Sequence, residues 1–206
     1  MKTITIIDYG MGNIWSVKSA FEYLNYNVVL SSSPLEIEKA EMLVLPGVGS
    51  YKRAMLKLSR NRLDQAIQNV VMGKKRKILG ICLGIQLMSI SGTEDGFING
   101  LGLIEASTDK FDLLKTDKLK IPHIGFNSVI TPLNTNLYKG FDDIVDFYFV
   151  HSYCVNIEKL NGDLGICNYG YDFLASYEKD NIFGTQFHPE KSQTNGLKLI
   201  SNFLRC

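Results

Sequence analysis

The sequence predicts an α/β fold in which helices flank a central, mostly parallel sheet that carries added antiparallel hairpins. One observation is that residues 3–91 alternate short apolar runs with helical patterns, which is typical of a parallel sheet covered by helices. The other is that short β-type runs alternate with turn residues beyond Gly96, which indicates hairpins. The 206 residues suffice for a sizeable core, and we expect residues 1–206 to form a single domain.

The first predicted strand runs from Thr3 to Asp8, and a helix follows it. Asn13 is a candidate N-cap for that helix, because the apolar residues after it recur at helical spacing. They are Ile14, Val17, Phe21 and Leu24. A second strand is expected near residues 27–30. After it, Ser33-Pro34-Leu35-Glu36 predicts a capping box with proline at the first helical position.

The third predicted strand covers residues 42–45 and ends at Pro46. A helix is expected next, because an apolar stripe typical of a core-facing helix follows. It consists of Leu63, Ala66, Ile67, Val70 and Val71. The basic run 74–77 is interpreted as a solvated helix end that leads into a buried central strand at residues 77–79. A further helix is predicted from Leu83 to Ser91.

The second half of the chain is predicted to hold short strands and a closing helix. The β-type runs are residues 101–104, 128–131, 147–155, 173–177 and 182–187. A turn at residues 178–181 separates the last two runs. Leu197, Ile200 and Leu204 lie at helical spacing and indicate a C-terminal helix.

Cys82 lies where the central strand is expected to meet a helix, within Gly80-Ile81-Cys82-Leu83-Gly84. A thiol at the positive N-terminal end of a helix is favoured as the thiolate, its reactive form. The flanking glycines have no Cβ atoms, so the backbone can turn tightly and a substrate carbonyl can approach, as in the nucleophile elbow of serine hydrolases. Taken alone, the pentapeptide is equally compatible with a small buried cysteine beside two turn glycines.

A second cluster, Thr185-Gln186-Phe187-His188-Pro189-Glu190, places a histidine 106 residues downstream of Cys82. A cysteine nucleophile needs an imidazole to take its proton, and the imidazole needs a carboxylate to fix its tautomer. His188 and Glu190 are two residues apart at the end of a predicted strand, so both side chains can leave on one side, and Pro189 is expected to end the ladder. By itself this tripeptide could be an ordinary strand exit. Its combination with Cys82 predicts a catalytic triad.

Composition and charge exclude several classes of function. The 22 basic and 21 acidic residues leave a formal charge of +1, so no global field attracts nucleic acid or an anionic membrane. No stretch reaches the ~20 apolar residues of a membrane span, and the first residues do not form a signal peptide. The four cysteines lack metal-ligand spacing, so we expect no metal, no cofactor and a reducing cytoplasm. Trp15 occupies the third glycine position of a dinucleotide fingerprint beginning at Gly10, which excludes that site.

With Cys82, His188 and Glu190 identified, the sequence resembles the class I, or triad, glutamine amidotransferases nearly end to end. Gly-Ile-Cys-Leu-Gly and His-Pro-Glu are the motifs of that superfamily, and they imply its α/β fold. The segments that support the resemblance are residues 8–13 with 16–17, 45–49, 79–86, 122–125 with 127, 147–153, and 186–192. Three motifs among them, Pro-Gly-Val-Gly, Pro-His-Ile-Gly and Phe-Val-His-Ser-Tyr, make the sequence most similar to the glutaminase subunits of imidazole glycerol phosphate synthases.

The resemblance implies a reaction on glutamine. Cys82 would attack the side-chain amide and form a thioester, while His188 would protonate the departing ammonia and then activate water. Glu190 would orient His188. Each role matches a residue type that nucleophilic catalysis requires.

The resemblance also implies an oxyanion hole built from the backbone N–H groups of Val48 and Leu83. Glycines on both sides of Val48 would allow a peptide flip that completes the hole when a partner is ready. Residues 46–49 could otherwise be a plain strand-ending turn. The matched glutamine contacts are Gly49, Gln86, Ser152 and Tyr153. Alternatively, Gln86 could face solvent and Tyr153 could fill the core.

The implied partner is a (β/α)₈-barrel cyclase subunit that forms a heterodimer and receives the ammonia to make imidazole glycerol phosphate and AICAR in histidine biosynthesis. The segment 122–126 is expected to face the barrel, together with four matched positions. These are Asn13, Phe126, Tyr148 and Lys191. Two features depart from the family: Phe126 stands where tryptophan is common, and Ser50-Tyr51-Lys52-Arg53 replaces a less basic run.

Three other functions remain open from the sequence. The same glutaminase chemistry could serve a paralogous barrel enzyme that amidates a surface-polysaccharide sugar. A stand-alone cysteine hydrolase acting on γ-glutamyl compounds would use the same elbow but needs no gating loop. A non-catalytic binding module would carry the triad as vestigial residues.

Overall fold

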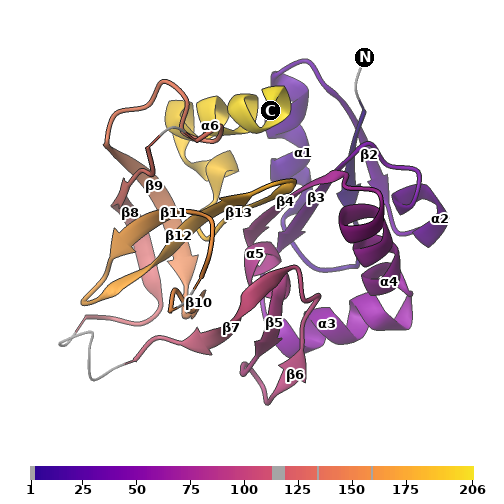
Figure 1. Cartoon of the computed structure of the whole chain (residues 1–206), viewed down its shortest axis with the longest axis horizontal. Helices are drawn as coiled ribbons and strands as arrows, with labels where there is room; N and C mark the ends of the chain where they lie inside the picture. Colours follow the sequence, from indigo (N-terminus) through magenta and orange to yellow (C-terminus); the bar gives the residue numbers. More distant parts are fainter. Residues whose placement is uncertain (1–2, 113–118, 134, 159) are drawn as a thin grey trace.

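The computed structural model describes residues 3–112, 119–133, 135–158 and 160–206 (Figure 1). Within these residues the larger sheet begins with five parallel strands. In spatial order they are β2 (Asn27–Ser31), β1 (Thr3–Ile7), β3 (Met42–Gly47), β4 (Lys77–Cys82) and β13 (Ile182–Thr185). The sheet continues with antiparallel strands: β12 (Asp172–Lys179), β11 (Asp163–Asn168), β8 (His123–Ile130) and β9 (Ile144–His151).

A smaller sheet lies beside the larger one and mixes parallel and antiparallel pairs. Its order is β10 (Tyr153–Val155), β7 (Ile104–Lys110), β5 (Ser89–Gly92) and β6 (Ile98–Asn99). The predicted α/β class, with a mostly parallel sheet and added antiparallel strands, is confirmed. The described helices include none long and apolar enough to cross a membrane.

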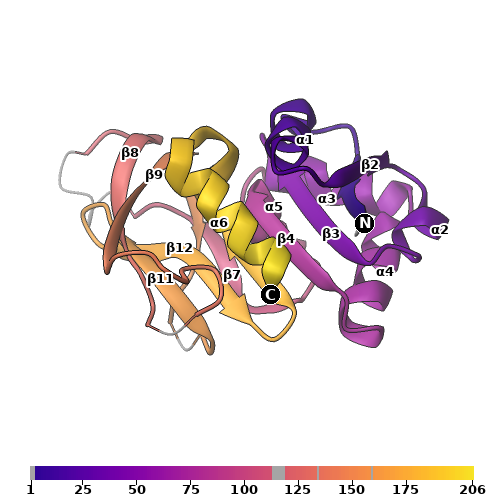
Figure 2. The same ribbon diagram turned by 90° about the horizontal axis from the view of Figure 1, so that it is seen from above.

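Helices cover both faces of the parallel strands. On one face lie α1 (Ile14–Tyr23) and α6 (Gln193–Arg205), which Figure 2 shows on the same side of the sheet. On the other lie α2 (Pro34–Ile37), α3 (Tyr51–Arg60) and α4 (Leu63–Gln68), the last continued by the π-helical turn η1 (Asn69–Gly73). Residues of β3 alternate between the two cores: Val44 packs with the first group, and Leu43 and Leu45 pack with the second.

The predicted helix over 83–91 is wrong in its second half. Helix α5 covers only Leu83–Leu87, and β5 begins at Ser89. The buried Ser89 hydroxyl donates to the Ser91 carbonyl at 2.9 Å, and the ring of Tyr51 lies directly over Gly92, where a Cβ would come within 2.7 Å of it. These contacts hold the segment extended against α3.

Other predicted boundaries also shift. Strand β3 continues through Pro46 to Gly47. Its pairing with β1 ends at Val44, so Pro46 has a neighbouring strand on one side only, where the missing N–H of proline is tolerated. The run 101–104 is mostly loop, and β7 begins at its last residue. The run 182–187 stops at Thr185, so Pro189 does not end the ladder. The sequence analysis assigned no element to α3, β6 or β11.

Neither predicted cap forms its side-chain hydrogen bond. Asn13 and Ser33 occupy the N-cap positions of α1 and α2, but neither side chain bonds its helix. The capping box fails because the Glu36 carboxylate accepts from the Ser31 hydroxyl at 2.6 Å instead. Residues 74–76 of the basic run are solvated as predicted, but Lys77 is half-buried at the start of β4. The 63–71 stripe is buried in the core.

Candidate active site

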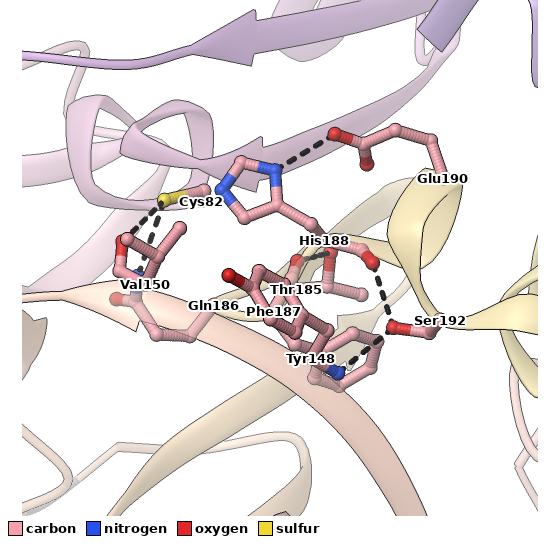
Figure 3. A network of polar contacts seen from close by, with 9 residues as sticks. All are labelled: Cys82, Tyr148, Val150, Thr185, Gln186, Phe187, His188, Glu190 and Ser192. Atoms are coloured by element: carbon pink, nitrogen blue, oxygen red, sulfur yellow. Dashed lines mark hydrogen bonds and ion pairs between the residues drawn. The ribbon is translucent and has the colours of Figure 1, made fainter. Parts of the chain in front are cut away.

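Cys82 ends β4 and stands at the N-cap of α5, on a strained turn. Its φ of 54° and ψ of −108° fall outside the regions that non-glycine residues normally adopt. The side chain is nearly buried, and Sγ lies 3.8 Å from the Val150 carbonyl oxygen and 3.8 Å from Nε2 of Gln186 (Figure 3). The strand-to-helix elbow predicted from the sequence is therefore present in the structure.

The two flanking glycines serve close packing rather than the turn itself. Neither takes a positive φ; that conformation falls on Cys82. A Cβ on Gly84 would lie 1.8 Å from the Leu45 carbonyl oxygen, and one on Gly80 would lie 2.7 Å from the Ile85 nitrogen. The glycines thus bring α5 directly onto β3 and β4. The prediction that these glycines supply the tight turn is therefore wrong, because Cys82 itself takes the strained conformation.

His188 lies between Cys82 and Glu190, and Figure 3 shows its Nε2 turned toward the sulfur. Its Nδ1 donates to Glu190 Oε1 at 2.8 Å, and its backbone N–H donates to the Tyr148 carbonyl of β9 at 2.9 Å. Glu190 belongs to the 3₁₀ turn η2 (Pro189–Lys191), so helical curvature brings the two side chains together, not the strand alternation assumed from the sequence. The hydroxyl of Ser192 fastens this turn by donating to the His188 carbonyl at 2.7 Å.

The charges around His188 favour its protonated form. Burial alone lowers the pKa of His188, but Cys82 and Glu190 together outweigh burial and raise the pKa to about 10. The His188 Nε2 atom is buried and makes no hydrogen bond of normal geometry to the described residues. An imidazolium with a free N–H beside a sulfur atom can pair with a thiolate and can protonate a leaving amine.

A cavity of about 460 Å³ opens beside Cys82 and collects most of the predicted site residues. Its walls include Val48, Gly49, Cys82, Leu83, Gln86, Ser152, Tyr153 and Lys191. Gly47 pairs with Cys82 in the register of β3 and β4, so the loop that follows Gly47 begins beside Cys82. Gly49 has a φ of +96°, a conformation that glycine adopts without strain.

Gln86 is buried in this cavity and does not face solvent. Its Nε2 donates to the Tyr153 carbonyl at 2.7 Å and to Oε1 of Gln186 at 3.0 Å. Tyr153 lies at the start of β10 with its side chain partly exposed, so it does not fill the core. Ser152 connects β9 and β10, and its carbonyl accepts from the Phe111 backbone at 3.0 Å.

Glu94 is a cavity residue that the sequence analysis did not identify. It follows β5, and its carboxylate accepts the Tyr51 backbone N–H at 2.8 Å, at the start of α3. Burial raises the pKa of Glu94, an effect that this hydrogen bond opposes and nearby Asp95 reinforces. A lone acid in a turn carries no sequence signal; only the folding of the missed strand brings it to the cavity.

Three of the four predicted partner-facing residues lie together next to the cavity. Phe126 and Tyr148 are directly opposed on β8 and β9 with ring centroids 5.6 Å apart, and Lys191 Nζ lies 5.9 Å from the Tyr148 ring centroid. Phe126 is 51% exposed. Asn13 is exposed at the start of α1, a helix that contacts η2.

Two further histidines lie at the site, and one of them, His151, is part of the cavity wall. His123 and His151 are buried, with Nδ1 of the first 3.2 Å from Nε2 of the second. His151 Nδ1 donates to the Tyr153 carbonyl at 2.9 Å, so its Nε2 accepts from His123. Burial lowers the pKa of His123 to about 4 and that of His151 to about 3, so both are neutral.

Comparison with known proteins agrees with this geometry. The family model described as glutamine amidotransferase class-I matches residues 5–206. The imidazole glycerol phosphate synthase subunit HisH 1 of Campylobacter jejuni (strain RM1221) is 46% identical over 202 residues, covering 98% of this chain and 99% of that protein. The subunit HisH 2 of Methanococcus maripaludis is 42% identical over 202 residues, covering 98% of both.

The fold is similar to that of solved amidotransferase structures at low sequence identity. The structure of PurLQS from Thermotoga maritima aligns with a TM-score of 0.75 and 17% identity, covering 99% of this chain and 98% of that one. A glutamine amidotransferase crystal structure also aligns with a TM-score of 0.75, at 14% identity. This likeness supports the fold alone. From the family match and the close relatives, the chain belongs to the class I glutamine amidotransferases, among the HisH subunits of imidazole glycerol phosphate synthase.

Proposed function

We propose that Cys82 hydrolyses glutamine to glutamate and ammonia, with His188 as its acid and base. The observation that carries this is the buried His188 imidazole, held by Glu190 at 2.8 Å and turned toward Cys82. The thiolate attacks the side-chain carbonyl carbon, and His188 protonates the nitrogen that leaves as ammonia. Water, deprotonated by His188, then attacks the thioester, and glutamate leaves as the sulfur is released.

The oxyanion formed in both steps needs donors next to the sulfur. The backbone N–H of Leu83 follows the nucleophile at the start of α5, and Val48 begins the loop that leaves β3 opposite Cys82. We assign the oxyanion hole to these two groups. Gly49 gives the loop the freedom to reorient its peptides, which supports its role as a gate.

The cavity also offers groups that match the rest of glutamine. Glu94 supplies a negative charge for the α-ammonium group, which is the strongest complementarity available there. Gln86 has both N–H groups engaged, so its Oε1 is the atom able to accept from the substrate amide. Gly49, Ser152 and Tyr153 line the remaining wall.

A HisH chain works as one subunit of a synthase, and we propose that its partner is a (β/α)₈-barrel cyclase that takes the ammonia directly. Support comes from the exposed Phe126 and Lys191 and from the half-buried Tyr148, whose ring contacts both; Lys191 is also part of the cavity wall. An aromatic pair flanked by a cation is typical of residues that anchor interfaces. A partner seated there would cover the cavity, so ammonia could pass between subunits without meeting bulk water.

The Cys82→Ala variant tests the nucleophile. In the assembled synthase it should abolish glutamate release from glutamine, while synthesis supported by added ammonium continues. Cys206→Ala, which removes a thiol far from the cavity, should keep both activities. Glutaminase activity retained by Cys82→Ala would refute the proposed nucleophile.

The partner is tested by measuring binding and glutaminase stimulation with purified barrel subunits. Phe126→Ala should weaken cyclase binding about tenfold or more, as expected for an interface anchor. Leu35→Ala removes a 69% exposed side chain on α2, at the opposite end of the sheet, and should leave binding unchanged. Stimulation only by a sugar-amidating barrel, or high turnover by the isolated chain, would contradict the proposed partner.

A further inference from the structure

Gln186 is a fully buried polar residue that the proposed reaction has not yet used. It lies between the end of β13 and His188, and its backbone N–H donates to the Ala175 carbonyl of β12 at 2.8 Å. Its carboxamide lies between two groups of the site. Nε2 is 3.8 Å from Cys82 Sγ, and Oε1 accepts from Gln86 Nε2 at 3.0 Å (Figure 3).

The direction of the Gln186 amide follows from its neighbours. The Tyr153 carbonyl can only accept, so the group that meets it at 2.7 Å must be the nitrogen of Gln86. That nitrogen uses its second N–H on Gln186, which must present oxygen in return. The nitrogen of Gln186 is then left facing Cys82. A reversed amide would place two nitrogen atoms against each other and an oxygen against the sulfur.

The Tyr153 carbonyl that begins this chain of hydrogen bonds is itself fixed. It accepts a second bond from His151 Nδ1 at 2.9 Å, and His151 is held in turn by His123. The orientation is therefore set by buried groups on β8, β9 and α5. None of these groups needs to move for the amide of Gln186 to keep its direction.

One hydrogen-bond acceptor and one donor lie next to the Cys82 sulfur, and they favour different protonation states. The Val150 carbonyl, 3.8 Å from Sγ, can accept from a neutral thiol and repels a thiolate. The Gln186 N–H does the opposite, because a hydrogen bond donated to a charged group stabilises the charged form. In a site where Cys82 is only 6% exposed, water supplies little of that stabilisation.

We propose that Gln186 is a catalytic residue that donates its Nε2–H to the Cys82 thiolate, with Gln86 as the positioning residue that aims it. The proposal rests on Cys82 being the glutaminase nucleophile. The Gln186 N–H stabilises the Cys82 thiolate before it attacks the substrate. It stabilises the thiolate again when hydrolysis of the thioester releases the sulfur. No proton is transferred to or from the amide in either step.

The test is the pH profile of Cys82 alkylation by iodoacetamide, measured in the full chain in a Cys206→Ala background. Gln186→Met keeps the length and removes the donor, and it should move the midpoint about one pH unit upward and lower kcat about tenfold with KM unchanged. Gln186→Glu replaces the donor with an acceptor and should move the midpoint further. Gln68→Met is the matched control, because its amide bonds the Leu101 carbonyl away from the cavity.

None of the variants replaces another titratable or charged group that faces Cys82. These groups are Tyr9, Glu94, His151, His188 and Lys191. An unshifted alkylation profile in a folded Gln186→Met chain would overturn the proposal, even with reduced kcat, because a purely structural role predicts that result. If Gln186→Met shows no folding transition, Gln86→Met decides on the same readout, because it adds no charge and removes the group that aims the Gln186 amide at the sulfur; an unshifted profile there would overturn the proposal. Glutaminase activity retained by Cys82→Ala would instead refute Cys82 as the nucleophile. The two negative results can therefore be distinguished.

Discussion

Lowering the pH from 6 to 5 should destabilise the fold through His123 and His151. The pKa values of these buried imidazoles are lowered to about 4 and about 3, whereas an unfolded histidine titrates near 6.5. Between pH 6 and 5 these two histidines therefore bind protons in the unfolded chain but stay largely unprotonated in the folded chain. Stability is lost as the pH falls, with a slope of up to about 2.5 kcal/mol per pH unit for two protons.

The total loss at pH 5 follows from the same values. Each histidine left neutral 1.5 pH units below 6.5 costs about 2 kcal/mol at 1.36 kcal/mol per unit, or about 4 kcal/mol for the pair. Screening of His123 by solvent reduces its share, so we expect about 3 kcal/mol in all. Such a loss is a large part of the free energy of unfolding of a typical domain, which is about 5–15 kcal/mol.

Urea denaturation at several pH values between 5 and 6.5 measures this slope. His151→Asn keeps a donor for the Tyr153 carbonyl but cannot titrate, so the slope should fall from about two protons to about one. His188→Asn is the control. The pKa of His188 is raised to about 10, so this residue stays protonated in the folded chain throughout the window. The unfolded residue is partly neutral near pH 6.5 and protonated near pH 5, so His188 adds only a small slope of opposite sign that vanishes towards pH 5. The chain has three histidines, and an unchanged slope in His151→Asn would refute the reasoning.

Two further predictions concern the elbow and the acid. Gly84→Ala places a methyl group 1.8 Å from the Leu45 carbonyl oxygen, so α5 must shift, and thermal melting should show a loss of about 3 kcal/mol or more. Gly73→Ala meets no atom within 4 Å and should melt like the unmodified chain; equal melting of both variants would contradict the packing argument. Glu190→Gln removes a charge that raises the pKa of His188, so glutaminase kcat should fall about 10²–10⁴-fold and its basic limb should move to lower pH. An unchanged kcat–pH profile would exclude that role for Glu190.

The parallel half of the fold was predictable because its strands are continuous apolar runs between helical stripes. Thr3, Asn27 and Met42 begin strands where the pattern places them. The failures have local causes. Helix α5 stops at Leu87 because tertiary contacts of Ser89 and Gly92 with Tyr51 override an apolar helical pattern, and such contacts leave no trace in nearby sequence.

Within the candidate site, the triad was recognisable because nucleophile, base and acid are three distinct chemical types in two short motifs. Their detailed geometry was not, since Glu190 reaches His188 through a 3₁₀ turn. No role could be assigned to Glu94 or Gln186 from the sequence, for a different reason. An acid in a turn and an amide before Phe187 are common residues, and only the folded chain places them beside Cys82.

The pairing of β4 with β13 also determines when the site comes into existence. Cys82 ends β4 and His188 follows the neighbouring strand β13, but the chain between them forms the whole antiparallel half of the large sheet and all of the small sheet. Closing so long a loop is a late and cooperative event in folding. A chain still being synthesised, or one opened at β13, would hold the thiol without its base. On the proposed roles of Cys82 and His188, we therefore expect glutaminase activity to report completed folding and an unfinished chain to release no ammonia.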